Sequence, residues 1–152
     1  MSDPITFDSS SPRFSLPLLF VGQAQKEAFV NEALALTDAL LHCAIEGQAA
    51  APPITPVDGT NWLVGAAPTG DWAGKADAIA CRQAGNWLFV QPRDGMRVLN
   101  RATGQEMRYV GGWQNPSAPA EPSGGTTVDA QARNAIAALI SSLKSAGVFA
   151  YP

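Results

Sequence analysis

The segment Gln23–Cys43 constrains the fold of this chain more than any other. It contains no Gly or Pro, and nearly all of its residues have good helix propensity. Apolar residues recur along it at steps of three and four, which is the period of an amphipathic α-helix. We therefore predict one long helix that begins at Gly22 or Gln23 and ends near Gly47, where a glycine can cap it.

Two apolar stripes run side by side along this predicted helix. The first stripe consists of Phe29, Ala33, Leu36, Leu40 and Cys43, and the second of Val30, Leu34, Leu41 and Ile45. A surface this wide must be covered. A sheet of the same chain and another subunit are both possible covers, and the sequence leaves both open.

Composition limits the class of protein. The chain has 152 residues, enough for one domain, and only 15% are charged, against roughly 25% in an average soluble domain. The 14 glycines and 12 prolines favour a turn-rich body. The net charge is −3 and the basic residues are scattered, so we expect no nucleic acid partner, because phosphate binding needs a basic stripe.

The N-terminal residues contain no targeting or membrane segment that we can identify. They lack the basic start and apolar run of a secretory signal, and no stretch approaches the 18 apolar residues of a membrane span. We predict an extended arm over residues 1–15 that orders only against a partner, with a frayed terminus as the alternative. A short apolar plug, Leu16–Phe20, follows it.

The middle of the chain is predicted to be β-structure. Apolar segments of strand length alternate with turn formers such as Ala84-Gly85-Asn86 and Pro92–Gly95. The expected strands are Thr60–Val64, Ala78–Gln83, Trp87–Gln91, Met96–Asn100 and Met107–Val110. We predict that they form a small antiparallel meander, which together with the first helix makes a domain over residues 16–114.

A second helix is expected after a linker. Residues 115–125 are rich in Pro, Ser and Gly, and residues 126–152 then read as a helix that starts with a Thr126–Asp129 capping box and stops at Gly147. Its apolar face would consist of Val128, Ala132, Ala135, Ile136, Leu139, Ile140 and Leu143. This face could dock on the body or bundle with copies of itself. The fold class is therefore α+β with a tethered C-terminal helix.

The search for catalytic chemistry yields no motif. Gly70–Ala76 superficially resembles a phosphate-binding loop, but its glycine spacing is wrong and no Ser or Thr follows Lys75. Cys43 and Cys81 are predicted to be buried free thiols, although a disulfide stays possible. We therefore expect no catalytic residue, no cofactor and no enzymatic activity.

Two weaker site hypotheses remain. Asp38, His42 and Glu46 would share one face of the first helix, either as a metal or acid–base site or as a solvated polar stripe. The tryptophans follow Gly, Asn or Asp in turn-rich contexts, so Trp72 and Trp113 could stack on sugar rings. The alternative is that they pin hairpin ends, which we favour for Trp62 and Trp87.

Four stretches carry a resemblance to a known family: Leu18–Leu34, Pro56–Gly65, Thr69–Gly74 and Gly85–Gly95. They contain the patterns G-Q-A-Q-K-x-x-x-x-N-E-A-L, P-x-x-G-x-x-W, T-G-x-W-A-G and G-x-W-x-F-x-x-P-x-x-G. Over about residues 11–113, the chain resembles an uncharacterised family of tailed phages, prophages and phage-like gene transfer agents. Members often form the N-terminal domain of tail-fibre or head-spike proteins.

The resemblance implies a structural role without catalytic residues. The expected protein is a virion component, made in the bacterial cytoplasm without a signal peptide, that serves as a homo-oligomeric spike base or adaptor. Its partners would be itself, as a trimer or pentamer, a fibre or spike protein, and a capsid or tail protein bound through the N-terminal arm. Many relatives continue into long fibre regions, whereas this sequence stops at Pro152, so we expect a base rather than a receptor-binding protein.

The two helices are the predicted means of self-association. The candidate residues are Phe29, Leu34, Leu36, Leu40, Ile136, Leu139, Ile140 and Leu143. The competing hypothesis is a carbohydrate-binding module that recognises host surface polysaccharide through Trp72 and Trp113.

Overall fold

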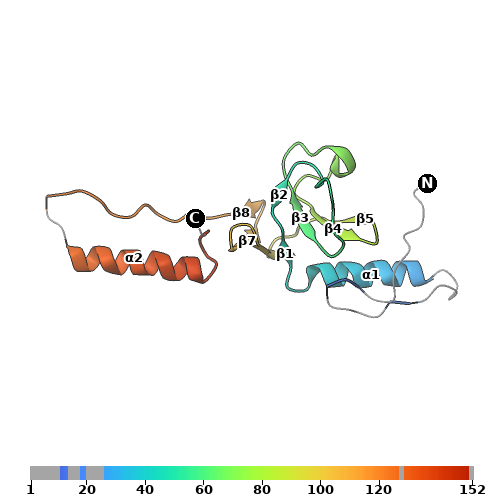
Figure 1. Cartoon of the computed structure of the whole chain (residues 1–152), viewed down its shortest axis with the longest axis horizontal. Coiled ribbons are helices and arrows are strands. Elements are labelled where there is room, and N and C mark those ends of the chain that lie inside the picture. The colour runs from blue at the N-terminus through green and yellow to red at the C-terminus, as the bar shows by residue number, and fades with distance from the viewer. Residues whose placement is uncertain (1–10, 14–17, 20–25, 127–128, 151–152) are drawn as a thin grey trace.

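The predicted α+β class is confirmed. The computed structural model describes residues 11–13, 18–19, 26–126 and 129–150, so most of the expected N-terminal arm and apolar plug lies outside the described residues (Figure 1). The described part contains two α-helices and eight strands in two small sheets, and the second helix follows a linker. In chain order the elements are α1 (Lys26–Leu40), β1 (Ala44–Ile45), β2 (Gln48–Ala49), β3 (Asn61–Val64), the 3₁₀ turn η1 (Gly70–Trp72), β4 (Ile79–Gln83), β5 (Asn86–Val90), β6 (Arg97–Asn100), β7 (Gln105–Tyr109), β8 (Trp113–Gln114) and α2 (Ala130–Ser145).

The first helix is shorter than the sequence predicts. It ends at Leu40, and His42 takes a left-handed conformation with φ of 46° that turns the chain into β1. The guanidinium of Arg13 satisfies carbonyls that this end leaves open, because it donates to the oxygens of Asp38, Ala39, Leu41 and His42 at 2.7–3.2 Å. The predicted end near Gly47 is therefore wrong.

The face of α1 that meets the body is small and polar. Asn31, Ala35, Asp38 and Ala39 are its buried residues, whereas Phe29 is 79% exposed. Alanines let the helix approach the sheet closely, and the amide of Asn31 bonds both the N–H and the C=O of Leu19, at 2.8 and 2.9 Å. Of the two possible covers for the wide apolar stripes, the body provides only part: Leu36 packs against the core, and Val30 and Leu41 stay more than 40% exposed.

The strands divide between two sheets rather than forming one meander. One sheet has the order β2-β3-β4-β5 and the other β1-β6-β7-β8. The two-residue strands β1 and β2 add a parallel partner to β6 and to β3, respectively, and the remaining pairs are antiparallel. Because β1 and β2 are separated by only two residues, the segment Ala44–Ala49 contributes one strand to each sheet and holds the sheets together.

Both predicted hairpins are present. Gln83 pairs with Asn86 across Ala84 and Gly85, whose φ angles of 47° and 75° are those of a two-residue type I′ turn. Asn100 pairs with Gln105 in the second hairpin, and the side-chain oxygen of Asn100 accepts from the N–H of Ala102 inside its loop. Turn chemistry therefore sets the register of each pair.

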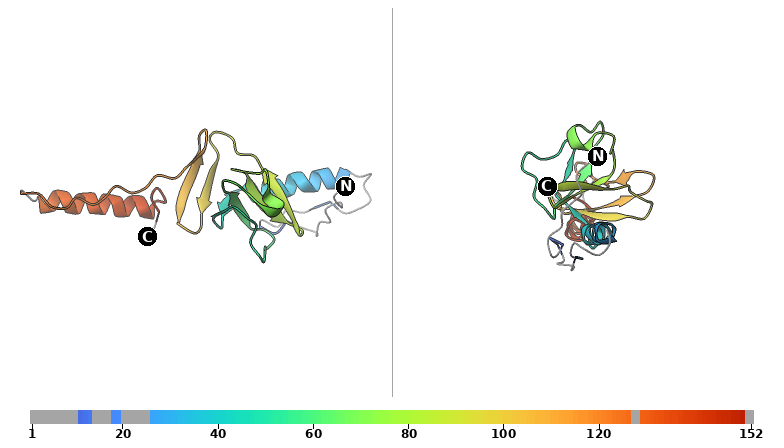
Figure 2. Two further views of the ribbon diagram at one scale, coloured as in Figure 1. Left: turned by 90° about the horizontal axis from the view of Figure 1, so that it is seen from above. Right: turned by 90° about the vertical axis from the view of Figure 1, so that its right-hand side faces the viewer.

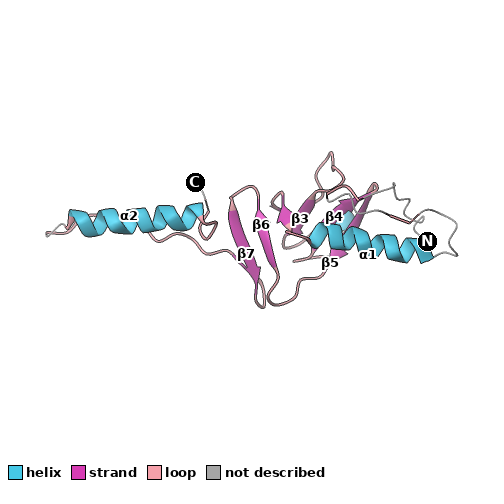
Figure 3. Cartoon of the chain, turned by 90° about the horizontal axis from the view of Figure 1, so that it is seen from below, coloured by secondary structure: helices cyan, strands magenta, loops and turns pink. Residues whose placement is uncertain are grey.

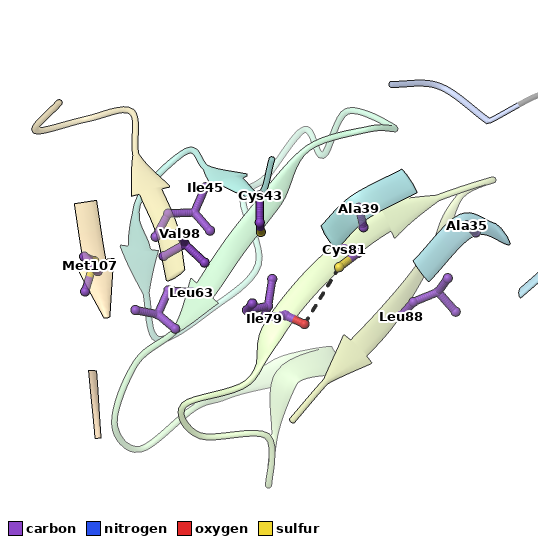
Figure 4. Packing of buried hydrophobic residues seen from close by; sticks show 10 residues of the cluster. All are labelled: Ala35, Ala39, Cys43, Ile45, Leu63, Ile79, Cys81, Leu88, Val98 and Met107. Carbon is purple, nitrogen blue, oxygen red and sulfur yellow. Dashed lines mark hydrogen bonds between the residues drawn. The ribbon is translucent and has the colours of Figure 1, made fainter. Parts of the chain in front are cut away.

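The main core lies where α1 and the two sheets converge (Figure 4). Ile45, Leu63 and Ile79 have no exposed surface at its centre. The buried members are Ala35, Ala39, Cys43, Ile45, Leu63, Ile79, Cys81, Leu88, Val98 and Met107. A second, smaller cluster joins Val64, Trp72 and Ala80 on the other face of β3 and β4.

The second helix extends away from the body (Figures 2 and 3). Its N-cap is Asp129, whose carboxylate accepts from the N–H of Ala132, so Thr126 is not the cap. Gly147, with φ of 73°, ends it in a Schellman motif in which the N–H of Val148 bonds the carbonyl of Leu143. The carbonyl of Gly147 then accepts from the N–H of Glu106 at 2.7 Å, which attaches this end of α2 to β7.

The buried amide of Asn61 offers a test of how α1 is fastened to the sheets. It is 2% exposed and donates to the carbonyls of Ala39 and Ala44 at 3.0 and 3.3 Å. We expect Asn61→Ala to lower the free energy of unfolding by about 1–3 kcal/mol, because two carbonyls lose a buried donor. Urea denaturation measures this loss.

The matched control is Asn115→Ala in the exposed linker. This variant should stay within about 0.5 kcal/mol of the parent chain. Equal midpoints for the two variants would contradict the role assigned to Asn61.

Candidate self-association surface

An apolar stripe on α2 is exposed. Ile136 is 43% and Leu139 59% exposed, Ala132 and Ala135 lie beside them in the open, and Leu143 is half-buried. Ala132, Ile136, Leu139 and Leu143 follow one another at steps of four, three and four, which is the spacing of a helix–helix seam. We call these four residues together with Ala135 the α2 stripe.

The linker covers a different flank of the same helix. Arg133 donates through its guanidinium to the carbonyls of Pro122 and Gly124 in the linker. Ile140, one of the predicted self-association residues, is only 6% exposed, so the chain itself already covers it. The linker thus contacts the flank of α2 that carries Arg133, the buried Ile140 lies on that flank as well, and the α2 stripe stays open.

The α2 stripe carries no charge. Arg133 and Lys144 are the charged residues between Ala130 and Ser145, and both are half-buried on the flank that includes Ile140. Rotational symmetry brings each residue of a helix seam close to its own copies. An uncharged stripe can therefore meet itself without like-charge repulsion.

The candidate residues on α1 are less uniform. Phe29 is the most exposed of them, and Leu40 is 36% exposed at the end of the helix. Leu34 and Leu36 are half-buried, and Leu36 packs against the core. The sequence could not show which of these residues would be buried. The face of α1 that packs against the body is formed mainly by Asn31 and small alanines rather than by large apolar side chains.

The two candidate sugar-binding tryptophans lie in different surroundings. Trp72 has no exposed surface and packs between Trp62 and Trp87, with ring centroids 6.5 and 5.1 Å away. Trp113 is half-buried, and its Nε1 donates to the carbonyl of Asp77 at 2.9 Å. The ring of Trp72 thus has no face open to a sugar in this structure, and glycan contact by Trp113 stays a prediction.

The polar triplet predicted on one helix face is not formed. Asp38 is buried on α1 and accepts from the N–H of Arg13 at 3.0 Å, whereas Glu46 lies beyond β1 and accepts from Arg101 at 2.6 Å. His42 sits in the left-handed turn between them. The predicted placement of the three residues on one helix face is wrong, because the helix ends before His42. Among the described residues there is no group of three side chains that could bind a metal ion.

The two cysteines are buried free thiols in the core, as predicted. Burial raises the pKa of Cys43 to about 11 and that of Cys81 to about 12. The nearby thiol of Cys43 further raises the pKa of Cys81, whereas Arg13 opposes both shifts. Neither thiol is therefore activated as a nucleophile at neutral pH.

The motif-bearing residues of the body build the fold. Asn31 fixes Leu19 beside α1, Trp72 fills the smaller cluster, and Gly85 supplies a turn of positive φ.

One family of known proteins matches residues 30–114, which is more than half of the chain. The chain belongs to the family described as protein of unknown function (DUF2793). No curated protein and no solved structure matches it.

The family match covers the chain from within α1 to β8 and leaves α2 outside. The match thus lies within the body, and the α2 stripe lies outside the matched residues. Within the described ranges, neither helix is long and apolar enough to cross a membrane.

The thiols provide one test of the core. At pH 8 a thiol of pKa 11 is ionised in about one molecule in a thousand, so iodoacetamide should label neither cysteine in the native protein and both in urea. Mass spectrometry counts the labels. Rapid labelling of the native protein would contradict the burial of the thiols.

The raised pKa values also predict how stability depends on pH. Because both thiols ionise at a lower pH in the unfolded chain than in the folded chain, we expect the free energy of unfolding to fall as the pH rises above about 9.

The tryptophans provide a second test. Trp72→Ala should lower the free energy of unfolding by about 3–5 kcal/mol, because it empties a fully buried site. Trp113→Ala should cost less, about 1–2 kcal/mol, since the ring is half-buried and loses one hydrogen bond. Thermal denaturation compares them, and an equal cost would contradict the difference in packing.

Proposed function

We propose that this chain is a structural component of a phage or of a phage-like particle such as a gene transfer agent. In this proposal it is a homo-oligomeric base or adaptor that attaches a spike or fibre protein to the capsid or tail. The observation that carries the proposal is the α2 stripe, an uncharged apolar surface on a helix that the body does not cover.

The shape of the molecule supports an adaptor. The family-matched body lies at one end and α2 extends from it at the other, joined to β7 through the residues that follow the helix (Figure 1). A protein with this outline can present its body to one partner while its helices gather around a common axis. Parallel association of α2 would place all the bodies of a trimer or pentamer on the same side.

The sequence resemblance supplies the link to particles. The G-Q-A-Q-K…N-E-A-L, T-G-x-W-A-G and G-x-W-x-F-x-x-P-x-x-G motifs are those of the fibre- and spike-associated family that the chain resembles. The residues of these motifs that the structure describes pack helix, loop and hairpin together, as Asn31, Trp72 and Gly85 illustrate. A scaffold without a proposed catalytic role suits a structural protein, so we propose no enzymatic activity.

Association through the α2 stripe is directly testable. We expect the full-length chain to form a trimer or pentamer in light scattering, and Leu139→Asp to shift it toward monomer. A carboxylate within an apolar seam would have to be desolvated without a partner, which costs several kcal/mol per interface. Ser141→Asp is the matched control, because it places the same charge on an exposed residue outside the stripe.

The role in a particle needs a second measurement. Particles purified from the source organism should contain this chain in a fixed ratio to a capsid or tail protein, as measured by quantitative mass spectrometry. Absence of the chain from purified particles would overturn the proposed function. A monomer that binds host polysaccharide would favour the carbohydrate-binding module instead.

A further inference from the structure

The open face of the sheet β1-β6-β7-β8 is hollowed at the foot of α2. A cavity of about 440 Å³ lies between this face and residues Ala146–Val148, which follow the helix. A second hollow of about 350 Å³ adjoins it and extends toward His42. Arg97 and Glu106 line both hollows, and we call the two adjoining hollows together the foot groove.

The foot groove has an excess of positive charge. Arg97 and Arg108 face each other across the β6–β7 pair, and both are exposed. Glu106 pairs with Arg97 at 3.5 Å, in a surface ion pair of the kind that exchanges readily. The guanidinium of Arg108 makes no hydrogen bond or ion pair with any residue that the structure describes. The groove therefore offers one free guanidinium and one loosely held one to an anion.

The end of α2 does not compete for these arginines. The carbonyl of Leu143 accepts from Val148 and that of Gly147 from Glu106, while the carbonyl of Val148 accepts from Nε2 of Gln105 at 2.9 Å. These bonds satisfy main-chain acceptors beside the groove. A carboxylate brought in from outside is thus the natural partner of Arg108.

Apolar side chains line the groove as well. Val148 is 41% exposed beside the first hollow, and Leu99 is 41% exposed beside the second. A fitting occupant would alternate carboxylates with apolar side chains over a short extended length. It would lack lysine and arginine, since Arg97 and Arg108 would repel them.

We propose that residues 1–10 of a neighbouring copy of this chain occupy the foot groove. This segment, MSDPITFDSS, has Asp3 and Asp8 as its only charged side chains and carries Ile5 and Phe7 between them. Ten extended residues span up to about 33 Å, enough to cross from one subunit to the next. The inference rests on the oligomer of the proposed function and names a contact that joins its subunits.

The geometry favours a neighbour over the same chain as donor. Pro12 lies against Gly59 and Arg13 donates to the carbonyl of His42, so residues 1–10 begin beside the hollow at His42, whereas Arg108 lines the other hollow, at the foot of α2. In contrast, α2 stripes that meet around an axis would bring the foot grooves of adjacent copies close together, because each groove lies at the end of its own α2.

Charge reversal in the full-length chain tests the contact. We expect Arg108→Glu alone and Asp3→Lys with Asp8→Lys alone each to raise the dissociation constant of the oligomer at least tenfold in sedimentation experiments. All three changes together should restore it to within about threefold, because the charges are again opposite. Arg93→Glu, an exposed arginine outside the groove, is the matched control and should have no effect.

Cross-linking decides which chain donates the segment. A tagged Asp8→Cys chain mixed with an untagged Gln114→Cys chain should form a mixed disulfide on oxidation with diamide, because Gln114 lines the groove and Cys43 and Cys81 are buried. A chain that carries both Asp8→Cys and Gln114→Cys is the comparison. If the disulfide forms only within this doubly substituted chain and not between the two singly substituted chains, the proposal is overturned. So would the absence of any disulfide, which would leave the segment for a capsid or tail protein.

The two proposals can fail separately. If charge reversal has no effect while Leu139→Asp still dissociates the oligomer, the foot groove does not hold the segment, but association through α2 stands. If purified particles lack the chain while the triple charge variant restores association, the contact stands without the proposed role.

Discussion

The amide of Asn61 connects the parts on which the rest of the structure depends. From β3 it donates to the carbonyl of Ala39 near the end of α1 and to that of Ala44 in β1. With Arg13 it satisfies acceptors at the point where the helix ends and the chain enters the first sheet. Because Ala44–Ala49 then supplies one strand to each sheet, fixing this exit also fixes how the two sheets meet over their common core.

Local patterns predicted the elements whose determinants are local. The β4–β5 hairpin follows from Ala84-Gly85, and the end of α2 from Gly147 with Val148. The end of α1 was missed because Arg13 and Asn61, distant in sequence, stabilise it there instead of Gly47. The division into two sheets was missed for a related reason: strands of two residues, such as β1 and β2, carry no detectable alternation.

The candidate surface was likewise predicted only where its determinants are local in the sequence. Periodicity correctly placed Ile136 and Leu139 on an apolar face of α2, yet it could not show that Ile140 would be buried while its neighbours stay open. On α1 the largest side chains attracted the prediction, whereas Asn31 and alanines meet the body, because close packing there depends on small size and paired hydrogen bonds. The foot groove had no sequence signal, since Arg97 and Arg108 meet only through strand register.

The attachment of α2 by its C-terminal end has a mechanical consequence. The tip farthest from the body is the N-terminal end of the helix, which residues 115–126 join to β8 (Figure 1). A pull on that tip, directed away from the body, is therefore carried by the covalent backbone of the linker as well as by the hydrogen bonds between Gly147–Val148 and Gln105–Glu106. Those hydrogen bonds set the stiffness of the joint under small loads, and the linker limits how far the tip can move under large ones.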